Sequence, residues 1–319
     1  MTTGLGSPAR GTLLLLDSAS LFFRAFYGVP DRRPTPDAPP NNAVRGFLDM
    51  MATLIVAHRP SHLVACWDDD WRPAFRIAAL PSYKAHRVAG GSNGQEDVPP
   101  QLRPQIPAIA EILAAFGLAR VGCPGYEADD VIGTLATRAV RDRRCSRVEI
   151  VTGDRDLFQL VDDAHAVRVL YTAKGGVRSP DLVTEAYLRE RYGVEGGSGY
   201  ADVSVLRGDP SDGLPGVAGI GEKTAAALIA SHGSLVALRQ AARNGDPRLP
   251  PARRLRLVES SDYLDAAVSV VRVVLDCPIG AVESQLPDHP ADPDRLMGLV
   301  ARYDLAAPAG RLTRALWGN

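Results

Sequence analysis

Nine acidic residues of this 319-residue chain fall into five short clusters, each placed just after an apolar run or inside a tight turn. They are Asp17; Asp68; Glu127, Asp129 and Asp130; Asp154 and Asp156; and Asp209 and Asp212. Carboxylates packed into one pocket repel and raise one another's pKa, so such a pocket needs cations to be stable. Oxygen ligands suit Mg²⁺ or Mn²⁺ better than Zn²⁺, and nine acids suit two ions or more. Because paired ions bind the attacking and leaving oxygens of a phosphodiester, the clusters indicate metal-dependent cleavage of an anionic substrate.

Each cluster taken alone has a simpler explanation. Asp129 and Asp130 fit the first turn of a helix, where the helix dipole favours each acid by roughly 0.3–1 kcal/mol. Asp154 fits a polar turn after a strand, and Asp209 precedes a proline, as in many turns and helix caps. The argument for a shared site therefore depends on all five clusters together.

The elements that must position these acids alternate between strands and helices. Apolar runs that end at acids predict strands over residues 12–16, 62–67 and 148–152. Helical periodicity is found over residues 20–27, 41–58, 72–80, 106–116 and 127–141. This alternation predicts an α/β fold with a mostly parallel central sheet flanked by helices. Sites in such sheets form at the carboxyl ends of the strands, so Asp17, Asp68 and Asp154 are expected at one edge.

The composition is that of an ordinary globular protein, with 45% apolar residues, 23% charged residues and a net charge of −1. The charge balance weakly opposes nucleic-acid binding, although a buried acidic cluster can mask basic charge elsewhere. The four cysteines are scattered and give no zinc or disulfide pattern. Neither a secretory segment nor a run long enough to span a membrane is found. The sequence therefore predicts a cytoplasmic protein without membrane association.

Lysine is rare in this chain. Only three of the 36 basic residues are lysine, and two of these, Lys84 and Lys223, fall in motifs suited to phosphate contact. Helical spacing would place Arg87 beside both Tyr83 and Lys84. This group is either an ordinary solvated stripe or a cationic rim that holds the scissile phosphate above the acids. In the second interpretation Tyr83 stacks on an unpaired base.

Two arginines extend this basic set. Arg24 lies a helix turn or two beyond Asp17 and is expected to reach the acidic pocket. Arg76 lies on the helix that Pro81 ends, and it is expected to contact DNA. The stretch 88–100 is rich in glycine, proline and polar residues, and we expect it to be mobile.

Residues 214–229 predict a helix, a glycine hairpin and a second helix. This stretch is not a phosphate-binding P-loop, because Glu222 stands between the glycines and Lys223. A hairpin whose backbone N–H groups meet DNA phosphates at a helix start fits better, and such contacts hold a duplex without reading its sequence. The expected DNA-contacting residues are Gly216, Gly219, Gly221, Lys223 and Thr224. The alternative is a plain helix–turn–helix packing unit.

Five motifs, in this order, resemble the bacterial and phage 5′ nucleases of the flap endonuclease superfamily, which includes the amino-terminal nuclease domain of DNA polymerase I. They are Asp17-Ser-Ala-Ser-Leu-Phe-Phe-Arg24, Tyr83-Lys84-Ala-His-Arg87, Gly125-Tyr-Glu127-Ala-Asp129-Asp130, Thr152-Gly-Asp154-Arg-Asp156 and Gly208-Asp209-Pro-Ser-Asp212-Gly-Leu-Pro-Gly-Val-Ala-Gly-Ile-Gly221-Glu-Lys223-Thr. The resemblance runs from about residue 12 to near residue 300. No polymerase module follows, so the chain resembles a free-standing 5′-3′ exonuclease.

The resemblance implies a separate role for each group of these residues. The first metal ion would be held by Asp17, Asp68, Glu127 and Asp129, with Asp130 next to them, and the second by Asp154, Asp156, Asp209 and Asp212. Catalytic roles are implied for Lys84, Arg24 and Arg87, DNA contacts for Arg76 and Tyr83, and a K⁺ ion for the hairpin. The implied substrates are 5′-flap, nicked or gapped duplex DNA and RNA–DNA hybrids, cut to leave a 5′-phosphate and a 3′-hydroxyl. The protein is expected to be a monomer associated with the nucleoid.

The resemblance also implies a domain organisation. Residues 1–11 would be a flexible leader, 12–200 a PIN-like 5′ nuclease core with a helical arch at 75–105, 201–288 a helix-hairpin-helix (helix–three-turn–helix) DNA-binding region, and 289–319 a segment packing back on the core.

Three positions depart from the family pattern. Gly213 replaces the usual asparagine, and Asp69 and Asp70 stand where small or basic residues are common. Two other functions remain open at this point, a PIN-type ribonuclease and a non-catalytic DNA-binding module. The hairpin opposes the first, and the complete set of acids opposes the second.

Overall fold

The computed structural model describes residues 11–35, 37–90 and 94–318. Within them six strands form one sheet in the order β3-β2-β1-β4-β5-β6. The strands are β1 (Thr12–Asp17), β2 (His62–Cys66), β3 (Ala119–Val121), β4 (Arg147–Thr152), β5 (Val167–Tyr171) and β6 (Asp181–Val183). All pairs are parallel except β5 with β6, so the predicted mostly parallel sheet is confirmed. The leader expected at residues 1–11 lies outside the described residues, apart from Gly11.

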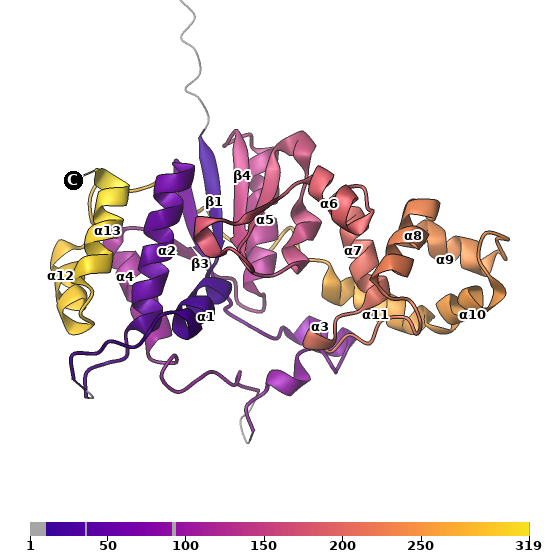
Figure 1. Ribbon diagram of the computed structural model, residues 1–319, viewed down its shortest axis with the longest axis horizontal. Helices are drawn as coiled ribbons and strands as arrows, with labels where there is room; N and C mark the ends of the chain where they lie inside the picture. The colour runs from indigo at the N-terminus through magenta and orange to yellow at the C-terminus, as the bar shows by residue number, and fades with distance from the viewer. Residues whose placement is uncertain (1–10, 36, 91–93, 319) are drawn as a thin grey trace, which may run out of the picture.

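Helices cover both faces of this sheet (Figure 1). The α-helices of the described residues are α1 (Ser18–Gly28), α2 (Asn42–His58), α3 (Ala74–Ala79), α4 (Gln105–Phe116), α5 (Ala128–Arg141), α6 (Glu185–Tyr192), α7 (Gly196–Arg207), α8 (Glu222–His232), α9 (Leu235–Arg243), α10 (Pro251–Glu259), α11 (Ser261–Val271), α12 (Pro293–Arg302) and α13 (Ala306–Trp317). Successive side chains of a strand point to opposite faces. Leu14 and Leu16 of β1 therefore pack with α1, α2 and α4, whereas Leu13 and Leu15 pack with α5.

The strand order places the acidic residues together. β1 lies in the centre, with β2 on one side and β4 on the other. Asp17 ends β1, Asp68 follows β2, and Asp154 follows β4, so the carboxyl ends of three adjacent strands carry acids. The chain continues from β1 to β2 and β3 on one side of β1, then moves to β4 and β5 on the other. This reversal of direction is where sheets of this type form their sites.

The helices before and within the expected arch are shorter than predicted. Proline residues bound α3, because Pro73 precedes its first residue and Pro81 follows its last turn, so the helix expected over 72–80 covers only Ala74–Ala79. Between α3 and α4, the described residues hold a 3-10 turn, Ala85–Arg87, and no α-helix. The repeated prolines and glycines of this stretch explain why an arch here is irregular rather than helical.

The helical part of the molecule extends to one side of the sheet (Figure 1). Its first helix, α7, begins at Gly196 and runs across the boundary expected at residue 200. The helix predicted to start the hairpin at residue 214 is absent from the described residues, because Gly213, Gly216 and Gly219 all have positive φ angles, of 77°, 72° and 75°. The hairpin instead connects α7 to α8.

The C-terminal helices return to the far side of the sheet (Figure 1). α12 and α13 pack on α4 and α2. Asn41 donates a hydrogen bond to the carbonyl of Tyr303 at 2.8 Å, and Arg311 contacts the Asp49 carboxylate at 2.7 Å. No helix in the described part of the chain is long and apolar enough to cross a membrane.

Candidate metal centre and nucleic-acid interface

Four acids form what we call the first half of the acidic site: Asp17, Asp68, Glu127 and Asp129. Asp17 is 5% exposed and caps α1 by accepting a hydrogen bond from the Ser20 backbone N–H at 3.1 Å. Its second carboxylate oxygen accepts from the Thr152 hydroxyl at 2.6 Å. Burial, with further contributions from neighbouring acids, raises the pKa of Asp17 to about 7. A buried carboxylate of this kind favours a cationic partner.

The other members of the first half meet at the start of α5. Asp68 accepts a hydrogen bond from the Ala128 backbone N–H at 2.8 Å, and burial raises its pKa. Burial, and then the charges of Asp154 and Asp17, raise the pKa of Asp129 well above its usual range. Glu127 is 4% exposed and occupies the N-cap position of α5.

Four further acids form the second half of the acidic site: Asp154, Asp156, Asp209 and Asp212. These stand on turns and 3-10 helices rather than on strands. The Asp156 backbone N–H donates to Asp154 at 2.9 Å, and the Ser211 N–H donates to Asp209 at 2.8 Å. Burial, followed by the charges of the other three acids, raises the pKa of Asp156 well above its usual range. The pKa of Asp212 is also raised by burial.

Two adjoining cavities bring the halves together. One, of about 410 Å³, is lined by Asp17, Asp68, Glu127, Asp129 and Asp154. The other, of about 30 Å³, is lined by Glu127, Asp129, Asp154, Asp156, Asp209 and Asp212. Because Glu127, Asp129 and Asp154 line both, acids from distant parts of the chain share one pocket.

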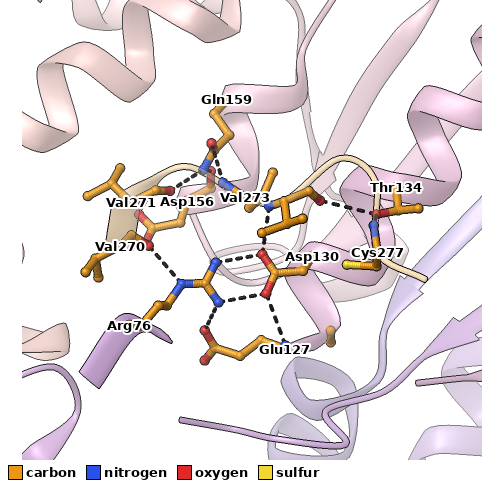
Figure 2. A network of polar contacts seen from close by, with 12 residues as sticks. Arg76, Glu127, Asp130, Thr134, Asp156, Gln159, Val270, Val271, Val273 and Cys277 are labelled. Carbon is orange, nitrogen blue, oxygen red and sulfur yellow. Dashed lines mark hydrogen bonds and ion pairs between the residues drawn. The ribbon is translucent and has the colours of Figure 1, made fainter. Parts of the chain in front are cut away.

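Asp130 is the exception among the nine acids. Its side chain is fully buried and points away from the pocket into the interior, where both carboxylate oxygens bind the guanidinium of Arg76 at 2.6 and 2.7 Å (Figure 2). Arg76 is itself 2% exposed and also donates to Glu127 at 2.5 Å. This placement is at odds with the expected roles of Asp130 as a metal ligand and of Arg76 as a DNA contact. A buried ion pair satisfies both side chains internally.

Tyr83 also differs from expectation. The ring is 4% exposed, and its hydroxyl donates to Glu127 at 2.7 Å. A buried ring cannot stack on an unpaired base, so in this conformation Tyr83 positions Glu127 instead.

Lys84 and Arg87 both lie against acids of the pocket, and we call this pair the rim. The Lys84 ammonium contacts Glu127 of the first half, and Arg87 contacts Asp212 of the second half at 2.6 Å. Neighbouring acids raise the pKa of Lys84 well above its usual range despite burial, which keeps it charged. Arg24 was expected to reach the acidic pocket, but it lines neither cavity and donates to the Ala173 carbonyl at 3.2 Å instead.

The donor set fits a hard divalent cation, since every side chain of the two halves offers carboxylate oxygen. The Ser204 hydroxyl also fits a bound cation or its water. This hydroxyl is buried, lines the smaller cavity and has no hydrogen-bond partner among the residues that the structure describes. However, within residues 11–35, 37–90 and 94–318 no three Asp, Glu, His or Cys side chains stand close enough to hold one ion as they are. Glu127 and Asp212 are instead paired with Lys84 and Arg87.

The glycine hairpin presents an exposed helix start. Gly221 caps α8 and is exposed, as are Gly219 and Lys223, while Gly216 and Thr224 are partly covered. A side chain at Gly216 would meet the Arg207 carbonyl at 2.1 Å, so this glycine serves the fold. Glu222, which follows Gly221, pairs with Arg207 at 2.8 Å, and this contact offsets the repulsion that its charge would exert on a phosphate.

The departures from the family pattern have structural explanations. A side chain at Gly213 would meet the Ser82 carbonyl at 2.1 Å, so glycine lets the turn that holds Asp212 pack against the segment that holds Lys84. Asp69 lies 3.7 Å from the Arg120 guanidinium, and Asp70 accepts a hydrogen bond from the Arg72 backbone N–H at 3.2 Å.

Sequence reasoning missed two residues of the site. Gln159 binds the backbone carbonyl of Asp156 at 2.8 Å, and its position three residues after Asp156 is a signal that could have found it, because residues i and i+3 share a face of a 3-10 helix. The hydroxyl of Ser204 carries no such signal.

Acids from adjacent parallel strands, joined to a helical region that contains a glycine hairpin, define a class of proteins that act on phosphate esters. Two family models match the chain, "5'-3' exonuclease, N-terminal resolvase-like domain" over residues 12–193 and "5'-3' exonuclease, C-terminal SAM fold" over residues 196–294. The chain therefore belongs to the 5′-3′ exonuclease family, which confirms the resemblance found in its motifs.

Several relatives extend over the whole chain. A 5′-3′ exonuclease of Streptomyces coelicolor is 54% identical over 306 residues, which cover 95% of this chain and 99% of the relative. One of Mycobacterium tuberculosis is 49% identical over 317 residues, covering 96% and 98%. The DNA polymerase I of Mycobacterium leprae is 37% identical over 311 residues, which cover 95% of this chain but 31% of the polymerase.

Solved structures share the fold at lower identity. T5 D15 protein co-crystallised with metal ions has a TM-score of 0.62 and 16% identity, covering 96% of this chain and 98% of its own. The catalytic core of Rad2 in complex with DNA substrate has a TM-score of 0.58 and 16% identity, covering 98% and 94%.

Proposed function

We propose that this 5′-3′ exonuclease is a structure-specific 5′ nuclease that hydrolyses DNA phosphodiesters near single-strand/duplex junctions. It cuts 5′ flaps, degrades nicked or gapped duplex from the 5′ end, and removes RNA primers during replication and repair. The observation that carries this proposal is the pocket shared by eight carboxylates, with Lys84 and Arg87 at its rim. Such a pocket attracts divalent cations, and the cations together with the rim attract a phosphate.

Mg²⁺ or Mn²⁺, as two or more ions, is the cofactor that these side chains fit best. The first half of the acidic site would hold one ion and the second half the other. The bound ions supply a nucleophilic water and offset the charge of the phosphate. Lys84 and Arg87 are paired here with Glu127 and Asp212, and both would be available to bind the scissile phosphate if those carboxylates held cations. Arg24, which here donates to the Ala173 carbonyl, would bind the phosphate after releasing that carbonyl.

The hairpin would hold the duplex part of the substrate. Gly219, Gly221 and Lys223 are exposed at the start of α8, where backbone N–H groups and a lysine attract phosphates. Gly216 and Thr224 shape the turn, and a K⁺ ion between the hairpin and the DNA backbone would complete the contact. We further propose that the protein acts as a monomer in the cytoplasm, on nucleoid DNA.

The experiment that tests this function is product mapping on one 5′-labelled flap substrate. With Mg²⁺ or Mn²⁺ we expect cleavage near the junction, leaving a 5′-phosphate and a 3′-hydroxyl, and EDTA should abolish it. Cleavage that survives EDTA, or that occurs only on single-stranded RNA, would contradict the proposal. The second result would favour a PIN-type ribonuclease.

A further inference from the structure

The segment that leaves the helical region forms a wall of the acidic pocket. We call residues 270–277 the return segment, which comprises the end of α11 and the stretch that follows it. Val270, Val271 and Val273 line the smaller cavity together with acids of both halves. Figure 2 shows side chains from three other elements converging on this segment.

The first half of the acidic site is fastened to the return segment through Arg76. The Arg76 guanidinium donates to the Val270 carbonyl at 3.0 Å and to Glu127 at 2.5 Å. Its partner Asp130 accepts from the Val274 backbone N–H at 2.8 Å. Glu127 is thus connected to residues 270–274 through the buried Arg76 side chain, whose guanidinium nitrogens all donate hydrogen bonds.

The second half is fastened to the same segment through Gln159. The side-chain amide of Gln159 donates to the carbonyls of Val271 at 2.9 Å and Asp156 at 2.8 Å. Its carbonyl oxygen accepts from the Val273 backbone N–H at 3.1 Å (Figure 2). Both amide hydrogens and one acceptor position are therefore used, which fixes the orientation of the group.

The return segment is also anchored on its other side. Arg272 donates to Asp202 of α7 at 2.5 Å, and Asp202 accepts from the Leu235 backbone N–H at the start of α9 at 2.8 Å. Asp202 is 3% exposed. A segment held on both sides in this way is a rigid reference for the groups attached to it.

We propose that Gln159 and Arg76 are positioning residues that set the separation between the two halves of the acidic site, because each fastens one half to the same five residues of backbone. The inference rests on the proposed function, since the separation matters only if both halves act on one phosphate. Metal and catalytic groups must be held to within about 0.5 Å of their working geometry. Two independent loops would not meet that requirement without a common support.

A purely packing role explains these contacts less well. Burying an arginine and an aspartate costs desolvation energy, and apolar residues of similar volume are often as stable or more so. The polar pair and the amide do what apolar residues cannot, because they fix direction as well as distance.

The test compares Gln159→Met, which keeps the length of the side chain but removes its hydrogen bonds, with Arg138→Met. Arg138 is a matched control. It donates to the carbonyls of Cys277 and Ile279 at 3.0 and 2.6 Å, so it also holds this part of the chain, but at residues that do not line the acidic pocket. Three quantities are measured: Mn²⁺ affinity without DNA by calorimetry, the single-turnover rate on a 5′ flap with enzyme in excess, and flap affinity in Ca²⁺.

We expect Gln159→Met to weaken Mn²⁺ binding and to slow single-turnover cleavage by about tenfold or more each, the usual cost of losing a group that orients a metal ligand. Flap affinity should stay unchanged, and Arg138→Met should leave all three quantities unchanged. Enzyme excess makes the rate constant independent of the fraction of folded protein. If Gln159→Met does not fold, Gln159→Asn keeps the amide but is too short to reach both carbonyls, and the same losses are expected.

Two results would overturn the inference: wild-type Mn²⁺ affinity and rate in the Gln159 variant, or equal losses in the Arg138 variant. Arg76→Lys tests the other half, because a lysine cannot bind the Val270 carbonyl, Glu127 and Asp130 together, and the same pattern is expected. If the wild-type protein binds Mn²⁺ but cuts no flap, the proposed function fails, and the Mn²⁺ titrations still decide whether Gln159 and Arg76 position the acids.

Discussion

The two halves of the acidic site are built on different kinds of structure. The first half stands at strand ends and at the first turn of α5, where Asp17 and Glu127 are buried. The second half stands on turns and 3-10 helices, where Asp154 is exposed. The comparison teaches that strand ends and a helix start position the first half directly, whereas the second half stands on short turns whose position depends on side-chain contacts such as those of Gln159.

The largest expected effect removes one acid from each half. Asp154→Asn and Asp17→Asn should each slow single-turnover cleavage in Mg²⁺ by about 1,000-fold, because each loses a charge that holds a cation. Flap binding in Ca²⁺ should be preserved for Asp154→Asn, which loses no phosphate contact. Cleavage near the wild-type rate in either variant would contradict the assignment of two metal-binding halves.

The same two variants should differ in stability. Without divalent ions at pH 8, Asp17→Asn should raise the melting temperature by about 2–4 °C, since it removes a buried charge. Asp154→Asn should change it little, because Asp154 is exposed. Calorimetric melting of both variants in EDTA measures the difference in melting temperature. Equal shifts would contradict the idea that burial of Asp17 costs stability and exposure of Asp154 does not.

The two basic residues at the rim extend the comparison, because Lys84 contacts an acid of the first half and Arg87 contacts an acid of the second half. Lys84→Ala should slow single-turnover cleavage by about 100-fold, and Arg87→Ala by about tenfold, because the more buried cation acts where the dielectric constant is lower. Lys84→Ala should weaken flap binding much less than it slows cleavage. An unchanged single-turnover rate for Lys84→Ala would contradict a role in the chemical step.

Without metal ions, the folded protein should become more stable when the pH is lowered from about 8.5 to about 5.5. The folded-state pKa of Asp17, about 7, lies above the value of 3.8 for an exposed aspartate, and the pKa values of Asp129 and Asp156 are also raised. The folded state therefore binds more protons, and its stability falls as pH rises through 7. In EDTA the melting temperature should rise by about 2–4 °C when the pH is lowered from about 8.5 to 5.5. Mg²⁺ should reduce this pH dependence. A melting temperature that falls in EDTA when the pH is lowered would contradict the prediction.

The smallest expected effect lies outside both halves. Lys223→Ala should weaken duplex binding about threefold and reduce the slope of log affinity against log salt by about 1, because one phosphate contact is lost. Arg295→Ala on α12, at the other end of the molecule (Figure 1), is the control. Identical salt slopes for the Lys223 variant and the wild-type protein would exclude a phosphate contact.

Much of the fold could be predicted because it is encoded locally. Strands β1 and β2 are largely apolar runs, and β4 is one that Glu149 interrupts. Each ends near an acid, so both the sheet and the edge that carries Asp17, Asp68 and Asp154 follow from the sequence. Gly117 ends α4 with a φ angle of 82°, as a glycine after a helical pattern predicts.

The structure departs from the sequence-based expectations where long-range pairing decides the position of a side chain. Asp130 and Arg76 are distant in the chain, and no local pattern shows that they bind each other inside the protein rather than a metal ion or DNA. Asp130 did carry a local signal, since it stands three residues after Glu127, and the two form a capping box at the start of α5. Tyr83 was assigned to the surface because its neighbours Lys84 and Arg87 are charged.

The chain after the return segment goes on to join the sheet region. The Leu63 backbone N–H of β2 donates to the Ser284 carbonyl at 2.8 Å, and the Leu286 N–H donates to Ser61 at 3.1 Å. These partners lie beyond residue 193, where the match to the first family model ends. A fragment of residues 12–193 expressed alone would lack both β2 contacts and the backbone N–H that binds Asp130. The two matched stretches therefore share hydrogen bonds, and we expect that a protein split between them would regain activity only when both pieces are present together.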